Sequence, residues 1–160
     1  MSYFSTRDKN LRFSFKDIFL RGLAPDGGLF MPSEIKKYNT SEIKELSKLS
    51  YLDLATEIIS TFCKSDLEKS KLKSLVEKSY KVFNNKEVVS IKRVGDINLL
   101  ELYNGPTLAF KDIAMQLLGN FYEYYLNNKN EKINIVVATS GDTGAASIDA
   151  IKGKENVNIF

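Results

Sequence analysis

The pattern from Ile133 to Phe160 constrains the fold of this chain more than any other feature of its sequence. It begins with "INIVVA", a continuous apolar run that is typical of a strand buried on both faces of a parallel sheet. A loop of small residues, "TSGDTG", then opens a helical pattern, and "VNIF" has the character of a second strand. Strand, loop, helix and strand in this order predict a βαβ unit, and therefore a protein of the α/β class.

The residues up to 84 show mostly helical spacing. Capping boxes are expected at Ser14–Asp17, where the helix would stop at Gly22, and at Ser50–Asp53. A third helix is expected from about Asp66 to Phe83. We therefore predict a mostly helical domain over residues 1–84.

The spacing of apolar residues changes after residue 84. The segments "VVSIKRV" and "INLLELY" predict two strands joined by a two-residue turn at Gly95 and Asp96. A helix from about Asp112 to Leu126 follows, and "NNKNEK" predicts a polar loop before the βαβ unit. We predict the start of an α/β domain over residues 85–160. Because the chain ends inside "VNIF" and leaves a small parallel sheet uncovered, we expect it to be part of a longer protein.

Histidine is absent from all 160 residues, which excludes a Ser-His-Asp triad, a Cys-His pair and a histidine-ligated metal site within the chain. The single Cys63 ends an apolar helical pattern, so we interpret it as a small buried side chain and not as a nucleophile. Acid–base or covalent chemistry must come from Lys, Asp, Glu, Tyr or Ser, and we expect no metal.

The net charge of +3 arises from lysines that alternate with carboxylates, which is typical of solvated helix faces and not of a nucleic-acid surface. No apolar run approaches the length of a membrane span, and the first residues lack the apolar core of a signal peptide. We therefore expect a cytoplasmic protein without nucleic-acid or membrane partners.

The loop "TSGDTG" is a candidate site for a carboxylate or phosphate, since it joins a strand to the unpaired amides of a helix N-terminus. Open α/β sheets bind ligands at this end of their strands. Asp142 is out of place beside an anion, so we expect it to face a hydroxyl or a cationic group. A well-capped loop without a ligand explains the same residues, and the local sequence leaves both interpretations open. The residues available to the ligand are Thr139, Ser140, Gly141, Thr143 and Gly144.

Lys111 lies where the loop "NGPTLAF" becomes a helix. A lysine amine is nucleophilic only in its neutral form, which apolar neighbours and a helix N-terminus both favour. Lys111 is therefore a candidate for Schiff-base chemistry, and a solvated lysine is the alternative that its local sequence leaves open. The candidate anion loop on the next strand–helix junction favours the first interpretation.

Three motifs, "GLAPDGGLFMP", "ELYNGPTLAFKD" and "VATSGDTGAAS", together with the opening "YFSTRD", resemble threonine synthases of the longer bacterial and fungal type in order and separation. The resemblance runs from Tyr3 to the last residue. It implies a helical N-terminal domain followed by the first, incomplete βαβ portion of a fold type II (tryptophan synthase β-like) pyridoxal-phosphate domain. It also implies conversion of O-phosphohomoserine and water into threonine and phosphate, with pyridoxal 5′-phosphate as the cofactor.

The resemblance further implies a role for each matching residue. Lys111 corresponds to the lysine that forms the internal aldimine and then moves protons between substrate carbons during γ-elimination and β-addition of water. Asp142 stands where related enzymes have an asparagine, which implies a contact with the cofactor's O3′. The loop implied to bind the substrate carboxylate consists of Thr139, Ser140, Gly141, Asp142 and Thr143.

The chain departs from the family at Asn104, where many members have histidine, and at Asp8, where members have glycine. A histidine role is therefore not transferred to Asn104. The loop that holds the cofactor phosphate and the residue that meets the pyridine nitrogen lie downstream in the family, so we expect the 160-residue chain to be inactive alone. A different fold type II lyase or dehydratase, and a truncated non-catalytic module, remain as alternatives.

Overall fold

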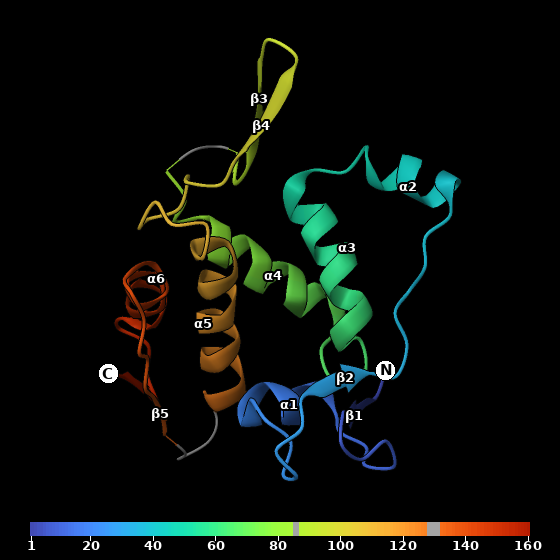
Figure 1. The fold of residues 1–160 in the computed structure, drawn as a ribbon, viewed down its shortest axis with the longest axis vertical. Helices are drawn as coiled ribbons and strands as arrows, with labels where there is room; N and C mark the ends of the chain where they lie inside the picture. Colours follow the sequence, from blue (N-terminus) through green and yellow to red (C-terminus); the bar gives the residue numbers. More distant parts are fainter. Residues whose placement is uncertain (85–86, 128–131) are drawn as a thin grey trace. The chain divides into compact units, whose positions relative to one another are not determined.

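The computed structural model describes residues 1–84, 87–127 and 132–160, and it confirms a mixed helix and sheet fold (Figure 1). The chain divides into two compact units, Met1–Ser74 and Leu75–Phe160, and the division falls within helix α4 (Lys69–Tyr80). The domain boundary expected after residue 84 stays a prediction, because residues 85 and 86 lie outside the described residues. The expected polar loop "NNKNEK" also falls largely outside them, on residues 128–131.

The first unit combines helices with one antiparallel pair of short strands. Tyr3 lies opposite Pro32 in this pair, and the Tyr3 hydroxyl donates a 2.7 Å hydrogen bond to the Phe62 carbonyl. The strand pair was not expected, because three residues are too few to show an alternating pattern. The elements that precede α4 are β1 (Tyr3–Ser5), α1 (Phe15–Arg21), β2 (Phe30–Pro32), α2 (Thr40–Leu46) and α3 (Tyr51–Cys63).

The helices of this unit begin at polar caps. α1 has the expected capping box at Ser14 and Asp17, and Gly22 ends it with a φ of 75°. At α3, Ser50 caps the amide of Asp53, but the Asp53 carboxylate accepts from the Ser50 hydroxyl and so the expected box is only half formed. α2 was missed, although Asn39 and Glu42 form a complete capping box at its start. The expected third helix is α4, shorter than predicted at both ends.

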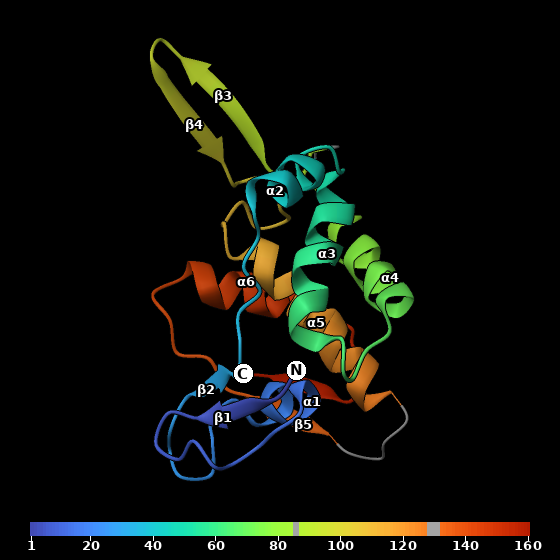
Figure 2. The ribbon, with the colours of Figure 1, turned by 90° about the vertical axis from the view of Figure 1, so that its right-hand side faces the viewer.

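The second unit contains the βαβ unit that the sequence predicts. β5 (Ile133–Ile135) and β6 (Val157–Ile159) pair in parallel, and α6 (Asp142–Ile151) connects them. α5 (Asp112–Leu126) has the predicted bounds and lies beside α6 (Figures 1 and 2). In this contact Gly119 of α5 lies against the Ala150 carbonyl of α6, and Ala146 and Ala150 of α6 are buried.

Strand β5 is shorter and less buried than predicted. The expected strand extends to Ala138, but β5 ends at Ile135, and the next side chain, Val136, is 79% exposed. Ile133 and Ile135 are only half-buried, so the prediction of burial on both faces is wrong for the described residues, in which the parallel sheet has two strands.

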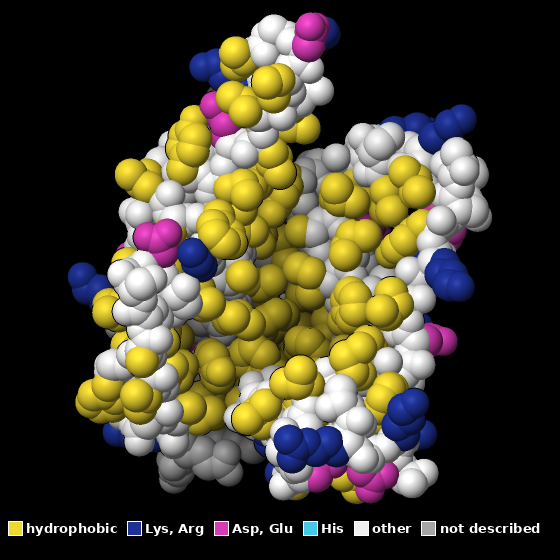
Figure 3. Space-filling view, viewed as in Figure 1, with side chains coloured by type: hydrophobic (Ala, Val, Ile, Leu, Met, Phe, Trp, Pro, Cys, Tyr) yellow, Lys and Arg dark blue, Asp and Glu magenta, His cyan; other side chains and the backbone are white. Residues whose placement is uncertain are grey.

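The second unit also contains the predicted hairpin. β3 (Ser90–Val94) and β4 (Ile97–Glu101) pair antiparallel with Gly95 and Asp96 as the two-residue turn. The hairpin extends beyond α5 and α6 of its own unit (Figures 1 and 2), and Figure 3 shows hydrophobic side chains on its surface.

Candidate active site

Lys111 occupies the N-cap position of α5, with backbone angles that are already helical (φ −59°, ψ −26°). Its side chain is 26% exposed, and its Nζ lies 3.6 Å from Oδ2 of Asp142, the first residue of α6. The same Nζ lies 4.2 Å from the centre of the Phe110 ring, close enough for a cation–π contact. Asp142 therefore faces a cationic group, one of the two kinds of partner that the sequence led us to expect.

The loop before Lys111 is fixed by contacts of buried polar groups. Asn104 Nδ2 donates to the Glu87 carbonyl at 3.0 Å. A Cβ at Gly105 would lie 2.4 Å from the Cβ of Asp112, so glycine leaves the space that Asp112 occupies. The fully buried Asp112 carboxylate accepts from the Thr107 amide at 2.8 Å and from the Thr107 hydroxyl at 2.7 Å. These bonds hold the residue next to Lys111 in one place.

Leu108 adds a strained turn to this loop. Its φ is 64°, an uncommon value for a residue with a side chain, and its amide donates to the Gly105 carbonyl at 3.1 Å. The turn leaves the Leu108 and Phe110 side chains largely exposed and buries Ala109 between them. The apolar setting that the sequence predicted for Lys111 therefore consists mainly of the Phe110 ring.

The start of α6 differs from the predicted row of unpaired amides. The Thr139 hydroxyl accepts from the Gly141 amide at 3.1 Å and from the Gly144 amide at 3.0 Å, so the prediction of free amides is wrong at these two residues. Among the described residues, the amides of Asp142 and Thr143 have no acceptor. Gly141 has a φ of 149°, a conformation that favours glycine. The helix start thus keeps two free donors.

The other predicted residues are divided between surface and interior. Ser140 and Gly141 are exposed. Thr143 lines a mostly apolar cavity of about 190 Å³ between α5, α6 and the two parallel strands. Within the described part of the chain, no hydrogen bond joins Ser140, Gly141 or Thr143 to Lys111. Of the predicted site residues, the structure brings Lys111 and Asp142 into contact.

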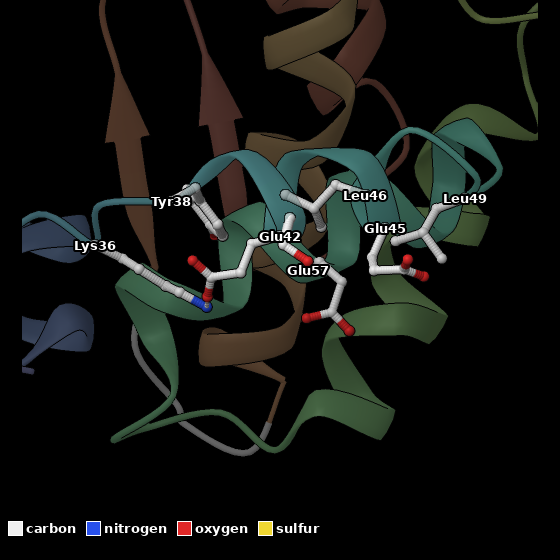
Figure 4. Close-up of a pocket in the computed structure, with 8 residues that line it drawn as sticks. Lys36, Tyr38, Glu42, Glu45, Leu46, Leu49 and Glu57 are labelled. Carbon is white, nitrogen blue, oxygen red and sulfur yellow. Dashed lines mark ion pairs between the residues drawn. The ribbon is translucent and has the colours of Figure 1, made fainter.

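A larger hollow of about 360 Å³ lies in the first unit, between α2 and α3 (Figure 4). Three carboxylates line it, and each is paired with a lysine: Glu42 with Lys36 at 3.5 Å, Glu45 with Lys48 at 2.6 Å, and Glu57 with Lys69. These pairs leave no excess charge for a ligand, and none of the predicted site residues lines the hollow. We therefore keep Lys111 and Asp142 as the candidate site.

The described residues hold no group of three or more His, Cys, Asp or Glu side chains arranged to bind a metal ion. Within the same residues, no helix has the length and apolar character needed to cross a membrane.

Two residues important to the site were missed from the sequence. Asp112 was noted only as the neighbour of Lys111, yet it is the buried group on which the preceding loop is built. Phe110 was interpreted as apolar surroundings, yet its ring faces the lysine amine. The signal available for Asp112 was a carboxylate in the first turn of a helix, five residues after a threonine, but burial itself is not visible in the sequence.

Comparison with known proteins agrees with the motifs. A family model described as threonine synthase N terminus matches residues 2–80. The whole chain is 41% identical to threonine synthase from Schizosaccharomyces pombe and 37% identical to threonine synthase-like 2 from Xenopus laevis, and it covers 33% and 34% of those proteins. A crystal structure of pyridoxal-phosphate-bound threonine synthase from Brucella melitensis superimposes with a TM-score of 0.91 at 38% identity, over 100% of this chain and 35% of that one.

The chain therefore spans about a third of the length of the curated relatives that it matches. The matches cover all of its residues, include the N-terminal family model and extend to the fold of a solved structure. The chain belongs to the threonine synthase family, in which it corresponds to the N-terminal part.

Proposed function

We propose that this chain is the N-terminal third of a threonine synthase, which converts O-phosphohomoserine and water into threonine and phosphate. One observation carries the proposal: the 3.6 Å contact brings Lys111 of the "AFKD" motif together with Asp142 of the "SGDTG" motif. The similarity over the whole chain to threonine synthases supports it. The cytoplasmic location expected from the sequence remains a prediction.

The residues present suit one side of a pyridoxal-phosphate site. Lys111 offers an amine that is partly exposed at a helix N-terminus, and Asp142 offers a carboxylate beside it. When bound, pyridoxal phosphate supplies an electron sink that stabilises negative charge on substrate carbons. The Lys111 Nζ would hold the cofactor and, once released, would carry protons between those carbons. The group that binds the cofactor phosphate is expected from the rest of the polypeptide.

The Asp142 carboxylate can exchange its present partner, the Lys111 amine, for a group of the cofactor. In the present structure it faces the Lys111 amine, and its side chain is 71% exposed. We propose that it accepts a hydrogen bond from the ring hydroxyl O3′ once Lys111 is engaged by the cofactor. An exposed ion pair contributes little to folding, so the exchange costs the fold little.

The start of α6 supplies the substrate carboxylate site in this proposal. The free amides of Asp142 and Thr143 point from a helix N-terminus, which favours an anion. Thr139 supports these donors indirectly, because its hydroxyl fixes the Gly141 and Gly144 amides. Ser140 is exposed and available as a further hydroxyl donor.

A second candidate is another fold type II lyase or dehydratase that acts on a related amino acid. The 37% identity to threonine synthase-like 2 favours keeping it, because a protein with a different name matches the whole of this chain to a similar degree. A third candidate is a truncated non-catalytic module, and the intact "AFKD" and "SGDTG" motifs argue against it.

The test is phosphate release by the complete polypeptide from O-phosphohomoserine and, in parallel, from phosphoserine and phosphothreonine. We expect release and threonine formation with O-phosphohomoserine alone. Lys111→Ala should abolish phosphate release. Lys152 is an exposed lysine at the end of α6, and Lys152→Ala should leave phosphate release unchanged. Release from phosphothreonine without formation of threonine would support the second candidate instead.

The 160-residue chain alone is expected to bind pyridoxal phosphate weakly, since the loop that holds the cofactor phosphate is expected in the rest of the polypeptide. An absorbance from lysine-bound cofactor that survives dialysis of this chain, and that Lys111→Ala removes, would contradict this expectation.

A further inference from the structure

The hairpin formed by β3 and β4 exposes more apolar surface than a hairpin in water normally carries. Five of its aliphatic side chains are between 47% and 72% exposed. Large exposed apolar patches mark interaction surfaces, and an isolated two-stranded hairpin is only marginally stable in water. The exposed side chains are Ile91, Val94, Ile97, Leu99 and Leu100.

These side chains lie on both faces of the hairpin. Ile91 pairs with Leu100 across the strands and projects from one face. The pairs Val94–Ile97 and Lys92–Leu99 project from the other face, because successive residues of a strand alternate. A solvated antiparallel sheet normally keeps one polar face. Each face therefore carries exposed aliphatic side chains beside polar ones, with Arg93 and Asn98 on the first face and Lys92 on the second. A hairpin with aliphatic side chains on both faces is suited to lie between two covering layers.

The hairpin's own unit supplies neither layer. β3 and β4 pack mainly against each other, and the hairpin extends beyond α5 and α6 (Figures 1 and 2). At its base, Ser90 donates to Glu101 at 2.9 Å, and hydrogen bonds from Tyr103 and Ser90 hold the pKa of Glu101 below its usual value. Polar contacts therefore fix the base of the hairpin, while the aliphatic side chains along its two strands stay exposed. Hydrophobic side chains are visible along it in Figure 3.

We propose that the β3–β4 hairpin is a docking arm, covered on both faces by the part of the threonine synthase polypeptide that residues 1–160 do not include. The inference rests on the proposed function, in that it places this chain within a complete enzyme. The chain spans about a third of its relatives, so the relatives carry ample further polypeptide. A covalently connected segment also docks at high effective concentration, whereas a second copy must pay for lost translational and rotational freedom.

The test is cysteine labelling of the complete polypeptide. Ile91→Cys and Leu99→Cys place one thiol on each face, and Asp96→Cys at the polar turn controls for access of the reagent. Each variant is treated with a maleimide in native buffer and in denaturant, so that it provides its own reference rate. In native buffer the natural Cys63 gives little background, because it is fully buried and burial raises its pKa to about 11. In denaturant it reacts as well, so the reference rate is that of the peptide carrying the introduced cysteine.

We expect the thiols at positions 91 and 99 to react about 100-fold or more slowly in native buffer than in denaturant, at rates unchanged by dilution. Native rates within about threefold of the denatured rates would overturn the proposal, and so would protection that is lost on dilution, which would identify a second copy as the cover. Hydrogen exchange of residues 88–103 in the unsubstituted polypeptide gives the same answer if a variant fails to fold. Neither measurement needs cofactor or substrate, so failure of the docking arm is separable from failure of the proposed reaction.

Discussion

The Nζ of Lys111 and Oδ2 of Asp142 lie 3.6 Å apart, and this contact joins the start of α5 to the start of α6. The two side chains differ in surroundings, since Lys111 is 26% exposed and Asp142 is 71% exposed. The lysine is therefore held by its loop and by the Phe110 ring, while the carboxylate reaches it from solvent. This asymmetry lets the effect of Asp142 on ligand binding be separated from its effect on folding.

Asp142→Asn and Asp142→Ala should barely change folding. An exposed ion pair contributes about 1 kcal/mol or less, so the free energy of unfolding in urea should shift by no more than that. Asp142→Ala should weaken pyridoxal-phosphate binding to the complete polypeptide by about tenfold or more, because a charge-assisted hydrogen bond is lost. Asp142→Asn keeps a hydrogen-bonding group at this position, so it should weaken binding less. Absorbance titration measures this, with the exposed Glu155→Gln as control. Unchanged cofactor affinity in both variants would remove Asp142 from the cofactor site.

Asp112→Ala should destabilise the protein strongly. The change leaves the Thr107 amide without its buried acceptor, which costs about 2–3 kcal/mol in the free energy of unfolding. Thr107→Val keeps the shape of the side chain and removes only the hydroxyl donor, so its cost should be smaller, about 1–2 kcal/mol. Urea unfolding of both variants measures the difference. A larger effect of Thr107→Val would show that the loop is not built on Asp112.

Gly119→Ala tests the contact between α5 and α6 through the sign of its effect. Helix propensity alone predicts that alanine stabilises the middle of a helix by about 1 kcal/mol. A Cβ at Gly119 would, however, lie 2.4 Å from the Ala150 carbonyl oxygen, so we expect net destabilisation of about 1–3 kcal/mol. Ala114→Gly, at an exposed position of the same helix, measures the propensity term separately. A stabilising Gly119→Ala would show that the helices are not in this close contact.

The free energy of unfolding should fall at alkaline pH. Burial raises the pKa of Cys63 from 9.0 to about 11 and, together with the nearby Cys63 and Asp66, raises the pKa of Tyr3 from 10.0 to about 12. The unfolded chain releases these protons first, so the stability is fully present below pH 9 and is lost as the pH rises to about 12.

Tyr3→Phe removes one of these two groups. Its decline between pH 10 and 12 should therefore be shallower than that of the natural chain. Equal slopes in the two proteins would assign the alkaline transition to other groups.

Local signals in the sequence predicted the elements that depend on local interactions. The bounds of α5 and the turn at Gly95 and Asp96 are set by apolar spacing and turn chemistry, and both were predicted correctly. The pairing of β1 with β2 was missed because it joins segments more than twenty residues apart, each three residues long. α2 was missed although its cap, Asn39, is visible in the sequence.

The candidate site was predictable in its residue types and less so in its contacts. Lys111 stands out because it follows the apolar Leu108, Ala109 and Phe110, and Asp142 because it is a charge in a loop of small residues. The burial of Asp112 depends on the space at Gly105, which is a tertiary property. That Thr139 donates its hydroxyl to a ligand stays a prediction. The structure adds that the same hydroxyl accepts from two amides of its own loop, which are therefore not free to bind a ligand.

Covalent trapping shows directly whether Lys111 is the residue that holds the cofactor. The complete polypeptide is incubated with pyridoxal phosphate, reduced with borohydride, digested and mapped by mass spectrometry. We expect the phosphopyridoxyl mass on the peptide carrying Lys111, and we expect Lys111→Ala to lose this label while Lys152→Ala keeps it. A label on another lysine, retained at full yield in Lys111→Ala, would contradict this expectation.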